Sequence, residues 1–383
     1  MLPLDGVTVV ALEQAVAAPF ATRQLADLGA RVIKIERPDG GDFARGYDTT
    51  TRGMSSHFVW LNRGKESITL DLKRPGQRQV LGRLLERADV FIQNLAPGAA
   101  DRLGLAPGRL REDHPRLIVC GVSGYGSSGP YRDKKAYDLL IQCESGLPSI
   151  TGTADQQVKT GIPVADIAGG MYAFSGILTA LYERERTGHG QALEISLLEA
   201  LAEWLGYPFY YTMYGGTPPA RTGLHHAALA PYGPFQAGDG GTVFLSVQND
   251  REWTRFCETV LLRPELAADP RFRDNDARRE NREDLQAVIE AVYAKLDTPT
   301  VIGRLEDAKI ANARLRDLTD LAEHPQLEAR ERWREVDSPV GALRALLPPI
   351  TLEGRTPRMD PIPDAGQDTR AILTELGYSE MPD

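Results

Sequence analysis

The stretch ATRQLADLGARVIKIE, residues 21–36, decides the fold class of the first third of the chain. Its first half has the apolar spacing of a helix, and Gly29 stands where a helix commonly ends. Its second half, RVIKIE at 31–36, alternates and is rich in β-branched residues, which is typical of a strand. The apolar run VTVVAL at 7–12 precedes it. These patterns together predict a strand–helix–strand unit.

The same alternation continues outward from this unit. Strands separated by helices need crossover connections, which predict an α/β fold with a mostly parallel sheet. A long helix, apolar almost throughout, is expected at 166–186, and such a helix is buried at a domain or subunit junction. Further strands are expected at 67–72, 89–94, 117–122, 193–196 and 242–247, and further helices at 75–87, 197–205, within 250–321 and at 371–376.

Composition limits the function classes. The chain has 383 residues, which suggests two or three domains. Its net charge of −9 argues against nucleic-acid and anionic-membrane partners, while leaving room for a local basic pocket. No apolar run approaching the ~20 residues of a membrane span and no basic leader are evident. Three cysteines, Cys120, Cys143 and Cys257, are too few for a disulfide framework or a zinc cluster. A cytoplasmic, metal-free protein is expected.

The common cofactor and nucleophile motifs are missing or poor. GYGSSG at 124–129 matches the dinucleotide fingerprint, but Pro130 follows it and no helix opens there, which predicts a flexible loop. Walker A, HExxH, GxSxG and CxxC patterns do not occur. His225 and His226 are adjacent and point in different directions, which does not suit a metal.

Asp166 lies in PVADIAGG at 163–170, where a loop enters the apolar helix. An aspartate there can act as the helix N-cap. Gly169 and Gly170, expected in the first turn, disfavour a helix and let another group approach the backbone closely. An ionised carboxylate at such a place can also act as a nucleophile. The residues alone leave both interpretations open.

Six segments, taken in order, resemble the class III CoA-transferases of the CaiB/BaiF superfamily, which includes formyl-CoA transferase and α-methylacyl-CoA racemase. The resemblance extends from Leu4 to about Gly377. The segments are LDGV at 4–7, LGARVIKIERP at 28–38, LNRGK at 61–65, NLAPG at 94–98, SGYG at 123–126 and TGHGQ at 187–191.

The resemblance implies a fold and an assembly. The fold would be a Rossmann-like large domain with a parallel sheet at 1–200, a linker at 201–225, a smaller α+β domain at 226–325, and a return to the large domain at 326–383. Two chains would form an interlocked homodimer.

The resemblance also implies that Asp166 is the catalytic residue. Its carboxylate, expected to be ionised at neutral pH, would attack the donor thioester to give a mixed anhydride and CoA thiolate. The thiolate would return to form an aspartyl-CoA thioester, and the acceptor carboxylate would reverse these steps. Each step forms an oxyanion that needs N–H donors, which the sequence does not assign.

Coenzyme A, carried in as acyl-CoA, is the implied cofactor. Basic side chains among its predicted contacts suit its phosphates. The predicted contacts are Val16, Ala17, Arg37, Leu70, Lys73, Asn94, Leu95, Ala96, Arg102, Lys135, Ala136, Tyr137 and Asp138. Formyl-CoA transferase has a glutamine at the position of Val16.

Two positions favour transfer over racemisation. The racemases carry a histidine base just before an aspartate, where this chain has Tyr137-Asp138. Tyrosine, with a pKa of about 10, is a poor base at neutral pH. An acidic stretch of the racemases corresponds here to APYGPF at 230–235, which has no acid.

The acceptor is predicted from two segments. GDGG at 238–241 is shorter than the glycine run of formyl-CoA transferases and predicts a hairpin turn, which counts against oxalate and formate. HHAALAPYGPF at 225–235 resembles members that use succinyl-CoA with dicarboxylic acids such as mesaconate, itaconate or citramalate. Arg221, His225 and His226 are expected to meet the acceptor's distal carboxylate. An α-methylacyl-CoA racemase-type isomerase and a non-catalytic CoA-ester-binding relative are the alternatives.

Overall fold

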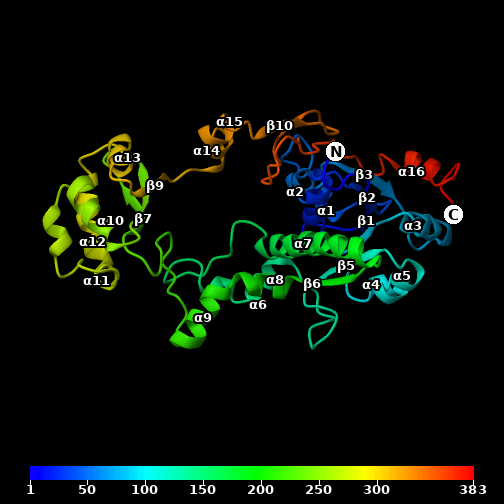
Figure 1. Cartoon of the computed structure of the whole chain (residues 1–383), viewed down its shortest axis with the longest axis horizontal. Coiled ribbons are helices and arrows are strands. Elements are labelled where there is room, and N and C mark those ends of the chain that lie inside the picture. The colour runs from blue at the N-terminus through cyan, green and yellow to red at the C-terminus, as the bar shows by residue number, and fades with distance from the viewer. The chain divides into compact units, whose positions relative to one another are not determined.

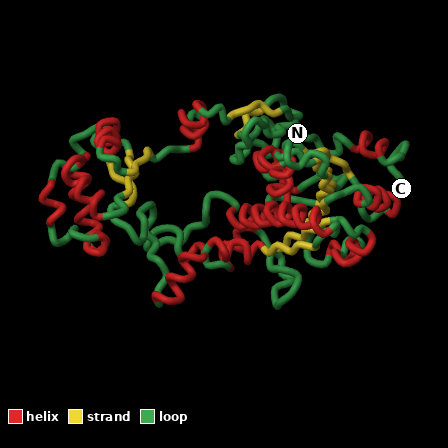
Figure 2. The backbone as a smooth tube through the Cα atoms, viewed as in Figure 1, coloured by secondary structure: helices red, strands yellow, loops and turns green.

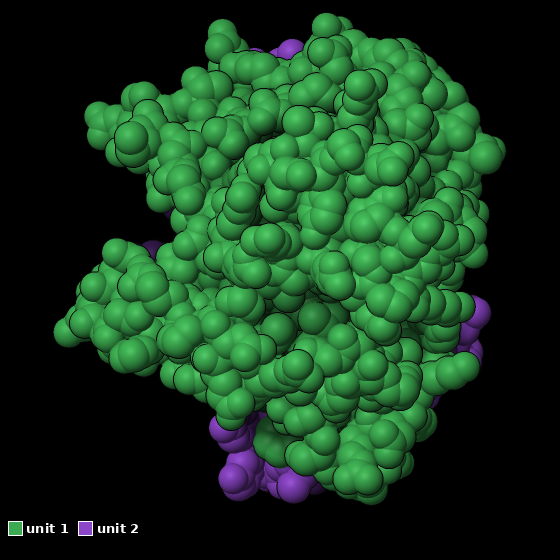
Figure 3. Space-filling view, turned by 90° about the vertical axis from the view of Figure 1, so that its right-hand side faces the viewer, with its two compact units in different colours: residues 1–147, 159–209, 329–383 green, residues 148–158, 210–328 purple.

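A computed structural model describes all 383 residues, which divide into two compact units (Figure 3). Unit 1 contains residues 1–147, 159–209 and 329–383, and unit 2 contains residues 148–158 and 210–328. The segment 148–158 lies inside the stretch that the sequence assigned to the large domain, and it groups with unit 2.

The centre of unit 1 is a six-stranded parallel sheet, as predicted (Figure 1). Its order, β3-β2-β1-β4-β5-β6, is that of dinucleotide-binding folds and reverses direction between β1 and β4. In such sheets ligands bind beyond the carboxyl ends of the strands at this reversal. The strands are β1 (Thr8–Leu12), β2 (Arg31–Glu36), β3 (Lys65–Thr69), β4 (Val90–Gln93), β5 (Ile118–Ser123) and β6 (Ala192–Ser196).

Helices cover both faces of this sheet (Figure 2). Alternate strand residues point to opposite faces, and because both sets are apolar, each face needs a layer of helices. Val9 and Ala11 of β1 pack in a core with α1 (Ala17–Asp27) and α7 (Val164–Thr187). Val10 and Leu12 pack in a second core with α3 (Pro75–Leu85), α5 (Pro107–Asp113) and α16 (Thr369–Glu375). The other helices of the N-terminal two thirds are η1 (Phe43–Gly46), α2 (Ser56–Leu61), α3 (Pro75–Leu85), α4 (Ala99–Arg102), α5 (Pro107–Asp113), α6 (Asp138–Glu144), η2 (Leu147–Ser149), α8 (Leu197–Trp204) and α9 (Gly206–Gly215).

The long helix α7 contacts α1, α8, β5 and β6. By length and composition alone this helix could cross a membrane, although no apolar run of that length was expected. Half of its most apolar stretch is buried inside the protein. Packing in the core of unit 1 accounts for its apolar composition.

Unit 2 is a smaller α+β unit with a three-stranded antiparallel sheet in the order β7-β8-β9. The turn at 238–241 joins β7 to β8, which confirms the predicted hairpin. Its core contains Trp253, Phe256 and Phe272. The elements are β7 (Tyr232–Gln236), β8 (Thr242–Ser246), α10 (Asp250–Arg255), η3 (Phe256–Val260), η4 (Pro264–Ala268), α11 (Asn275–Glu280), α12 (Arg282–Tyr293), α13 (Thr298–Asp307), β9 (Ala311–Arg314) and α14 (Leu318–Ala322).

The C-terminal residues return to unit 1. The Asp368 Oδ2 atom accepts a hydrogen bond from the backbone N–H of Ser67 at 2.8 Å, and α16 contacts the edge strand β3. The elements of this part are β10 (Trp333–Val336), β11 (Leu343–Leu346) and α16 (Thr369–Glu375), and α15 (Pro325–Ala329) lies at the end of unit 2.

Candidate active site

Asp166 is the third residue of α7 and not its N-cap. The cap position is Pro163, which makes no side-chain capping bond. Asp138, the first residue of α6, accepts the backbone N–H groups of Ala165 at 2.8 Å and Asp166 at 3.2 Å through its Oδ1 atom. The N-cap interpretation of Asp166 is therefore wrong. Asp138 accepts the N–H groups at the start of the helix, and the Asp166 carboxylate takes no part in capping it.

The two glycines that follow Asp166 are buried inside the helix and do not break it. A Cβ atom on Gly170 would lie 2.6 Å from the carbonyl oxygen of Ala17. A Cβ atom on Gly169 would overlap the side chain of Leu197. The groups that approach the α7 backbone are thus α1 and α8 of the protein itself.

The Asp166 carboxylate accepts no hydrogen bond from the protein. Burial, and then the negative charge of Asp138, raise the pKa of Asp166 to about 7. The direction of this shift differs from the expectation of an ionised carboxylate at neutral pH, because burial and a neighbouring carboxylate both favour the protonated form. Once ionised, a poorly hydrated carboxylate is a stronger nucleophile.

Tyr47, which no sequence pattern singled out, lies near this carboxylate. Burial, and then the charges of Asp42 and Asp166, raise the pKa of the Tyr47 phenol, with Tyr137 as a further neighbour. Its ring meets the His57 ring edge to face, with centroids 5.5 Å apart. Tyr47 follows η1, which comes soon after β2, so its position beyond a strand's carboxyl end was the available signal.

Most residues predicted to bind CoA lie beyond the carboxyl ends of the parallel strands. Asn94 ties the two central segments together, because its side-chain amide exchanges two 2.8 Å hydrogen bonds with the backbone of Gln14. Val16 and Ala17 follow β1, Arg37 follows β2, Leu70 and Lys73 follow β3, Asn94, Leu95 and Ala96 follow β4, and Lys135 to Asp138 follow β5 and lead into α6.

The basic residues predicted for the CoA phosphates differ in their surroundings. The Arg37 guanidinium donates to the carbonyl of Gly41 at 3.1 and 3.2 Å and lies over the Phe43 ring. Lys73, Arg102 and Lys135 are exposed and have no acidic partner. These three cations remain available to a phosphate.

A fully buried charge cluster lies beside the loop between β1 and α1. The Lys34 Nζ atom is 2.7 Å from Asp42 Oδ2, and the Lys65 Nζ atom is 2.6 Å from Glu13 Oε1. Burial outweighs the attraction of Glu13 and lowers the pKa of Lys65 to about 7. The Asp42 Oδ1 atom accepts the backbone N–H of Ala15, whose φ is +62°. The cluster therefore holds a strained residue directly before Val16.

Arg221, predicted to bind the acceptor, lies in unit 2 with protein partners. Its guanidinium donates to the carbonyls of Thr153 at 2.8 Å, Ala154 at 2.7 Å and Ser149 at 3.2 Å. Arg221 thereby holds the segment 148–158, and its contact with an acceptor stays a prediction.

His225 and His226 also have partners within unit 2. The His226 Nδ1 atom accepts the N–H of Ala228 at 3.1 Å, and its ring stacks on Tyr232. Burial, and then the charge of Arg282, lower the pKa of His225. A neutral His225 is a weaker partner for a carboxylate than a protonated one.

The structure confirms that the glycine-rich segment is a loop. The 124–129 segment is a loop, in which Gly126 donates its N–H to Ser123 Oγ at 3.0 Å, and the next helix begins only at Asp138. No group of three or more His, Cys, Asp or Glu residues is arranged to hold a metal ion. Cys120, Cys143 and Cys257 are free thiols.

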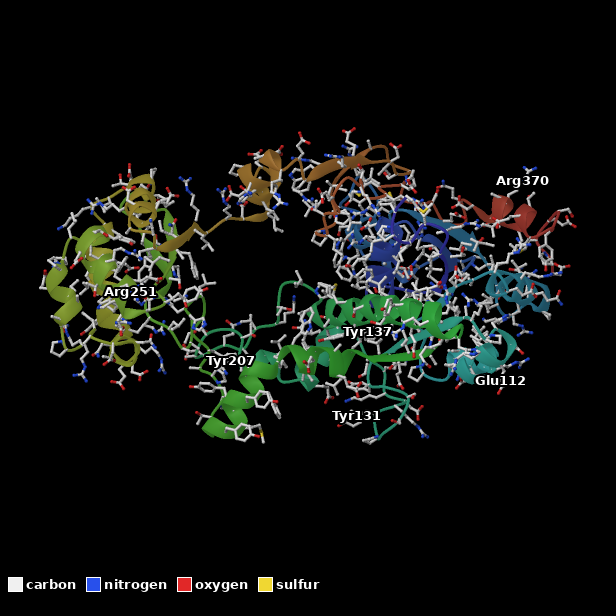
Figure 4. All side chains as sticks on the ribbon, in the orientation of Figure 1. Glu112, Tyr131, Tyr137, Tyr207, Arg251 and Arg370 are labelled. Atoms are coloured by element: carbon white, nitrogen blue, oxygen red, sulfur yellow. The ribbon has the colours of Figure 1, made fainter.

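A parallel sheet of this order with helices on both faces defines the α/β class of protein, and α7, which packs against the sheet, carries the Asp166 carboxylate without a protein donor. Figure 4 shows Tyr137 near the long helix α7 that carries this carboxylate. The comparisons with known proteins identify the family.

The sequence profile of CoA-transferase family III matches residues 4–369. The chain is 38% identical to the acetyl-CoA:oxalate CoA-transferase of Acetobacter aceti, over 86% of this chain and 84% of that protein. It is 32% identical to the succinyl-CoA:glutarate CoA-transferase of Mus musculus, over 99% of this chain and 88% of that protein. A CaiB/BaiF family crystal structure from Brucella suis superposes with a TM-score of 0.86 at 33% identity, covering 98% and 99% of the two chains. The protein belongs to the family III CoA-transferases and is an enzyme.

Proposed function

We propose that this enzyme moves CoA from succinyl-CoA to a short-chain dicarboxylic acid such as mesaconate, itaconate or citramalate, through a covalent aspartyl-CoA intermediate. The free Asp166 carboxylate, raised in pKa and lacking a protein donor, carries the catalytic part of this proposal. The resemblance of 225–235 and the name of the mouse relative, which pairs succinyl-CoA with a C5 dicarboxylate, support the substrates.

In the first half of the reaction an Asp166 carboxylate oxygen attacks the thioester carbon of the donor. The carbon–sulfur bond breaks, and CoA leaves as a thiolate, which leaves a mixed anhydride on Asp166. The thiolate then attacks the Asp166 carbonyl of the anhydride and expels the donor acid as a carboxylate. The aspartyl-CoA thioester that results keeps the energy of the original thioester bond.

In the second half the acceptor carboxylate attacks the aspartyl-CoA carbonyl and again expels CoA thiolate. The thiolate attacks the acyl carbonyl of the new anhydride, which forms the product thioester and returns Asp166 as a carboxylate. No net proton is taken up or released, so the site needs a nucleophile and oxyanion donors but no general base.

The first turn of α1 supplies the oxyanion donors in this proposal. Ala17 directly follows the cap residue Val16, and its carbonyl packs against Gly170, one turn along α7 from Asp166. A helix N-terminus carries unpaired N–H groups and a partial positive charge. CoA binds along the carboxyl edge of the sheet, with Arg37, Lys73, Arg102 and Lys135 near its phosphates.

We also propose an interlocked homodimer in the cytoplasm. Met213 and Tyr214 of α9 expose large side chains that a second chain would cover. The free thiols fit a reducing compartment. Light scattering after gel filtration would show about twice the chain mass of 42.0 kDa, and a monomer peak would refute the dimer.

The function is tested by one incubation in D₂O, analysed by liquid chromatography and mass spectrometry. The protein receives succinyl-CoA, a panel of oxalate, glutarate, mesaconate, itaconate and citramalate, and a 2-methylacyl-CoA. A new thioester of a C5 acid is expected, and a product only from oxalate would refute the acceptor. Deuterium at the α-carbon of the methylacyl-CoA, without a new thioester, would establish the racemase alternative.

The intermediate needs a separate test. The protein with succinyl-CoA and no acceptor is treated with hydroxylamine, which converts an aspartyl thioester to a hydroxamate. The peptide that contains Asp166 is expected to gain the hydroxamate mass, and the same peptide from Asp166→Asn is the control. Transfer without that mass, or with full activity in Asp166→Asn, would contradict the covalent mechanism.

A further inference from the structure

Helix α7 begins with an unusual arrangement, because the residue that caps it belongs to a different helix. The segment before α7 ends in Pro163, whose side chain offers no acceptor. The Asp138 Oδ1 atom takes over and accepts the N–H groups of Ala165 and Asp166. The backbone of the nucleophile is thus held directly by another carboxylate, 28 residues earlier in the chain.

The second oxygen of Asp138 is fixed as well. The Oδ2 atom accepts a hydrogen bond from Gln142 Nε2 at 2.6 Å. The Gln142 side chain is buried, and its Oε1 atom accepts the backbone N–H of Thr160 at 3.1 Å. Asp138 is therefore bound on both oxygens by a rigid network that joins α6, the segment before α7, and the first turn of α7.

We propose that Asp138 is the positioning residue of Asp166, because its carboxylate accepts the backbone N–H groups of Ala165 and of the nucleophile itself and so fixes the first turn of α7. This inference rests on the proposed role of Asp166. It differs from the expectation that Asp138 contacts CoA. Three hydrogen bonds from the protein already occupy the Asp138 carboxylate, and a negative charge repels phosphate.

The charge of Asp138 has a chemical consequence. Two titratable groups interact with Asp166, namely Asp138 from α6 and Tyr47 after η1, and Tyr137 is a neighbour of Tyr47. From α1 and α8 the residues against the first turns of α7 are uncharged, namely Ala17, Phe20 and Leu197. Burial is the larger cause of the raised pKa of Asp166, and Asp138 is the carboxylate that adds to it. The nucleophilicity of a carboxylate rises with its basicity.

The test uses two substitutions that remove different properties of the Asp138 side chain. Asp138→Asn keeps an oxygen acceptor for the α7 N–H groups and removes the charge, whereas Asp138→Ala removes both. Glu144→Gln is the matched control, because Glu144 ends the same helix and pairs with Lys134 on the surface. Melting temperatures by circular dichroism establish that each variant folds.

The first readout is the pH dependence of kcat for CoA transfer. Asp138→Asn is expected to keep its plateau kcat within about threefold and to shift the acidic limb to lower pH by about one unit. Asp138→Ala is expected to lose about tenfold or more in kcat with little change in the donor KM, because the nucleophile is displaced. Glu144→Gln is expected to match the wild type.

The second readout does not depend on the enzyme's substrates. A carbodiimide reacts with protonated carboxyl groups, and peptide mass spectrometry measures labelling of Asp166 against pH. The labelling midpoint is expected to fall in Asp138→Asn and to stay in Glu144→Gln. The inference would be overturned if folded Asp138→Asn kept both the labelling midpoint and the acidic limb of the kcat profile of the wild type. A raised donor KM with unchanged kcat in Asp138→Ala would also overturn it. Absence of CoA transfer by the wild type would instead refute the proposed function, and the labelling would still decide the role of Asp138.

Discussion

Adding one methyl group at Gly170 tests whether the packing of α7 against α1 sets the active site. A Cβ atom there would lie 2.6 Å from the Ala17 carbonyl oxygen and 3.0 Å from the Phe20 ring. A carbon–oxygen contact needs roughly 3.3 Å, so the two helices must separate by about 0.7 Å. The nearest atom, the Ala17 carbonyl oxygen, belongs to the backbone and cannot rotate away as a side chain can.

The energetic estimate for Gly170→Ala has two opposing parts. Alanine is a better helix former than glycine by about 1 kcal/mol. Overpacking of a dense interface costs about 1–3 kcal/mol. A net loss of about 1 kcal/mol in the free energy of unfolding is therefore expected. Because Asp166 stands one turn away on the same helix, a shift of this size is expected to reduce kcat by roughly 10–100-fold.

Gly176→Ala is the matched control on the same helix. Its added Cβ atom would lie 3.5 Å from Leu193 Cδ1, which is an ordinary contact. This variant is expected to gain up to about 1 kcal/mol in stability and to keep its activity. Urea unfolding followed by circular dichroism and the CoA-transfer rate measure both effects. If Gly170→Ala were as stable and as active as Gly176→Ala, the close approach of α1 would not be what positions Asp166.

Three further predictions concern single side chains. Because the pKa of Asp166 is raised in the native state, the native protein binds this proton more tightly than the unfolded chain, and the free energy of unfolding falls as pH rises from about 4 to about 7. Asp166→Asn should remove this slope and be more stable by roughly 1–3 kcal/mol at pH 8, measured by urea unfolding across pH; equal slopes would contradict the raised pKa. Lys34→Met should destabilise unit 1 by about 3–5 kcal/mol, because Asp42 and Glu13 lose a buried partner, and a stable variant in thermal unfolding would contradict the cluster's role. Arg221→Ala should expose the segment 148–158 to protease and, if Arg221 also meets the acceptor, raise the acceptor KM far more than the donor KM; equal KM changes would leave only the structural role.

The sheet could be predicted from the sequence because hydrophobic periodicity is a local property. The patterns at 21–28 and 31–36 correspond to α1 and β2, and β-strands were also expected where β3, β4 and β5 occur. The hairpin at 238–241 follows from a local glycine turn in the same way. Asp166 was recognised as a candidate because it enters an apolar helix and matches an ordered set of family segments.

The expected N-cap shows where local reasoning stops. The pattern of an aspartate before an apolar helix is equally typical of a cap and of a free side chain. The choice depended on Asp138, which is near Asp166 only because α6 packs against α7. Likewise, Gly169 and Gly170 predict a close approach, but only the fold identifies Ala17 and Leu197 as the approaching residues.

Local sequence patterns were enough to predict the strands of the parallel sheet, the family, and Asp166 as a candidate residue. The surroundings of Asp166 depend on the fold. Its pKa of about 7 needs burial and a second carboxylate, and both arise from segments distant along the chain. Tyr47 and the Glu13–Lys34–Asp42–Lys65 cluster reach the β1–α1 loop for the same reason. Desolvation and charge interactions act through space. These interactions therefore arise only when folding has brought the groups together.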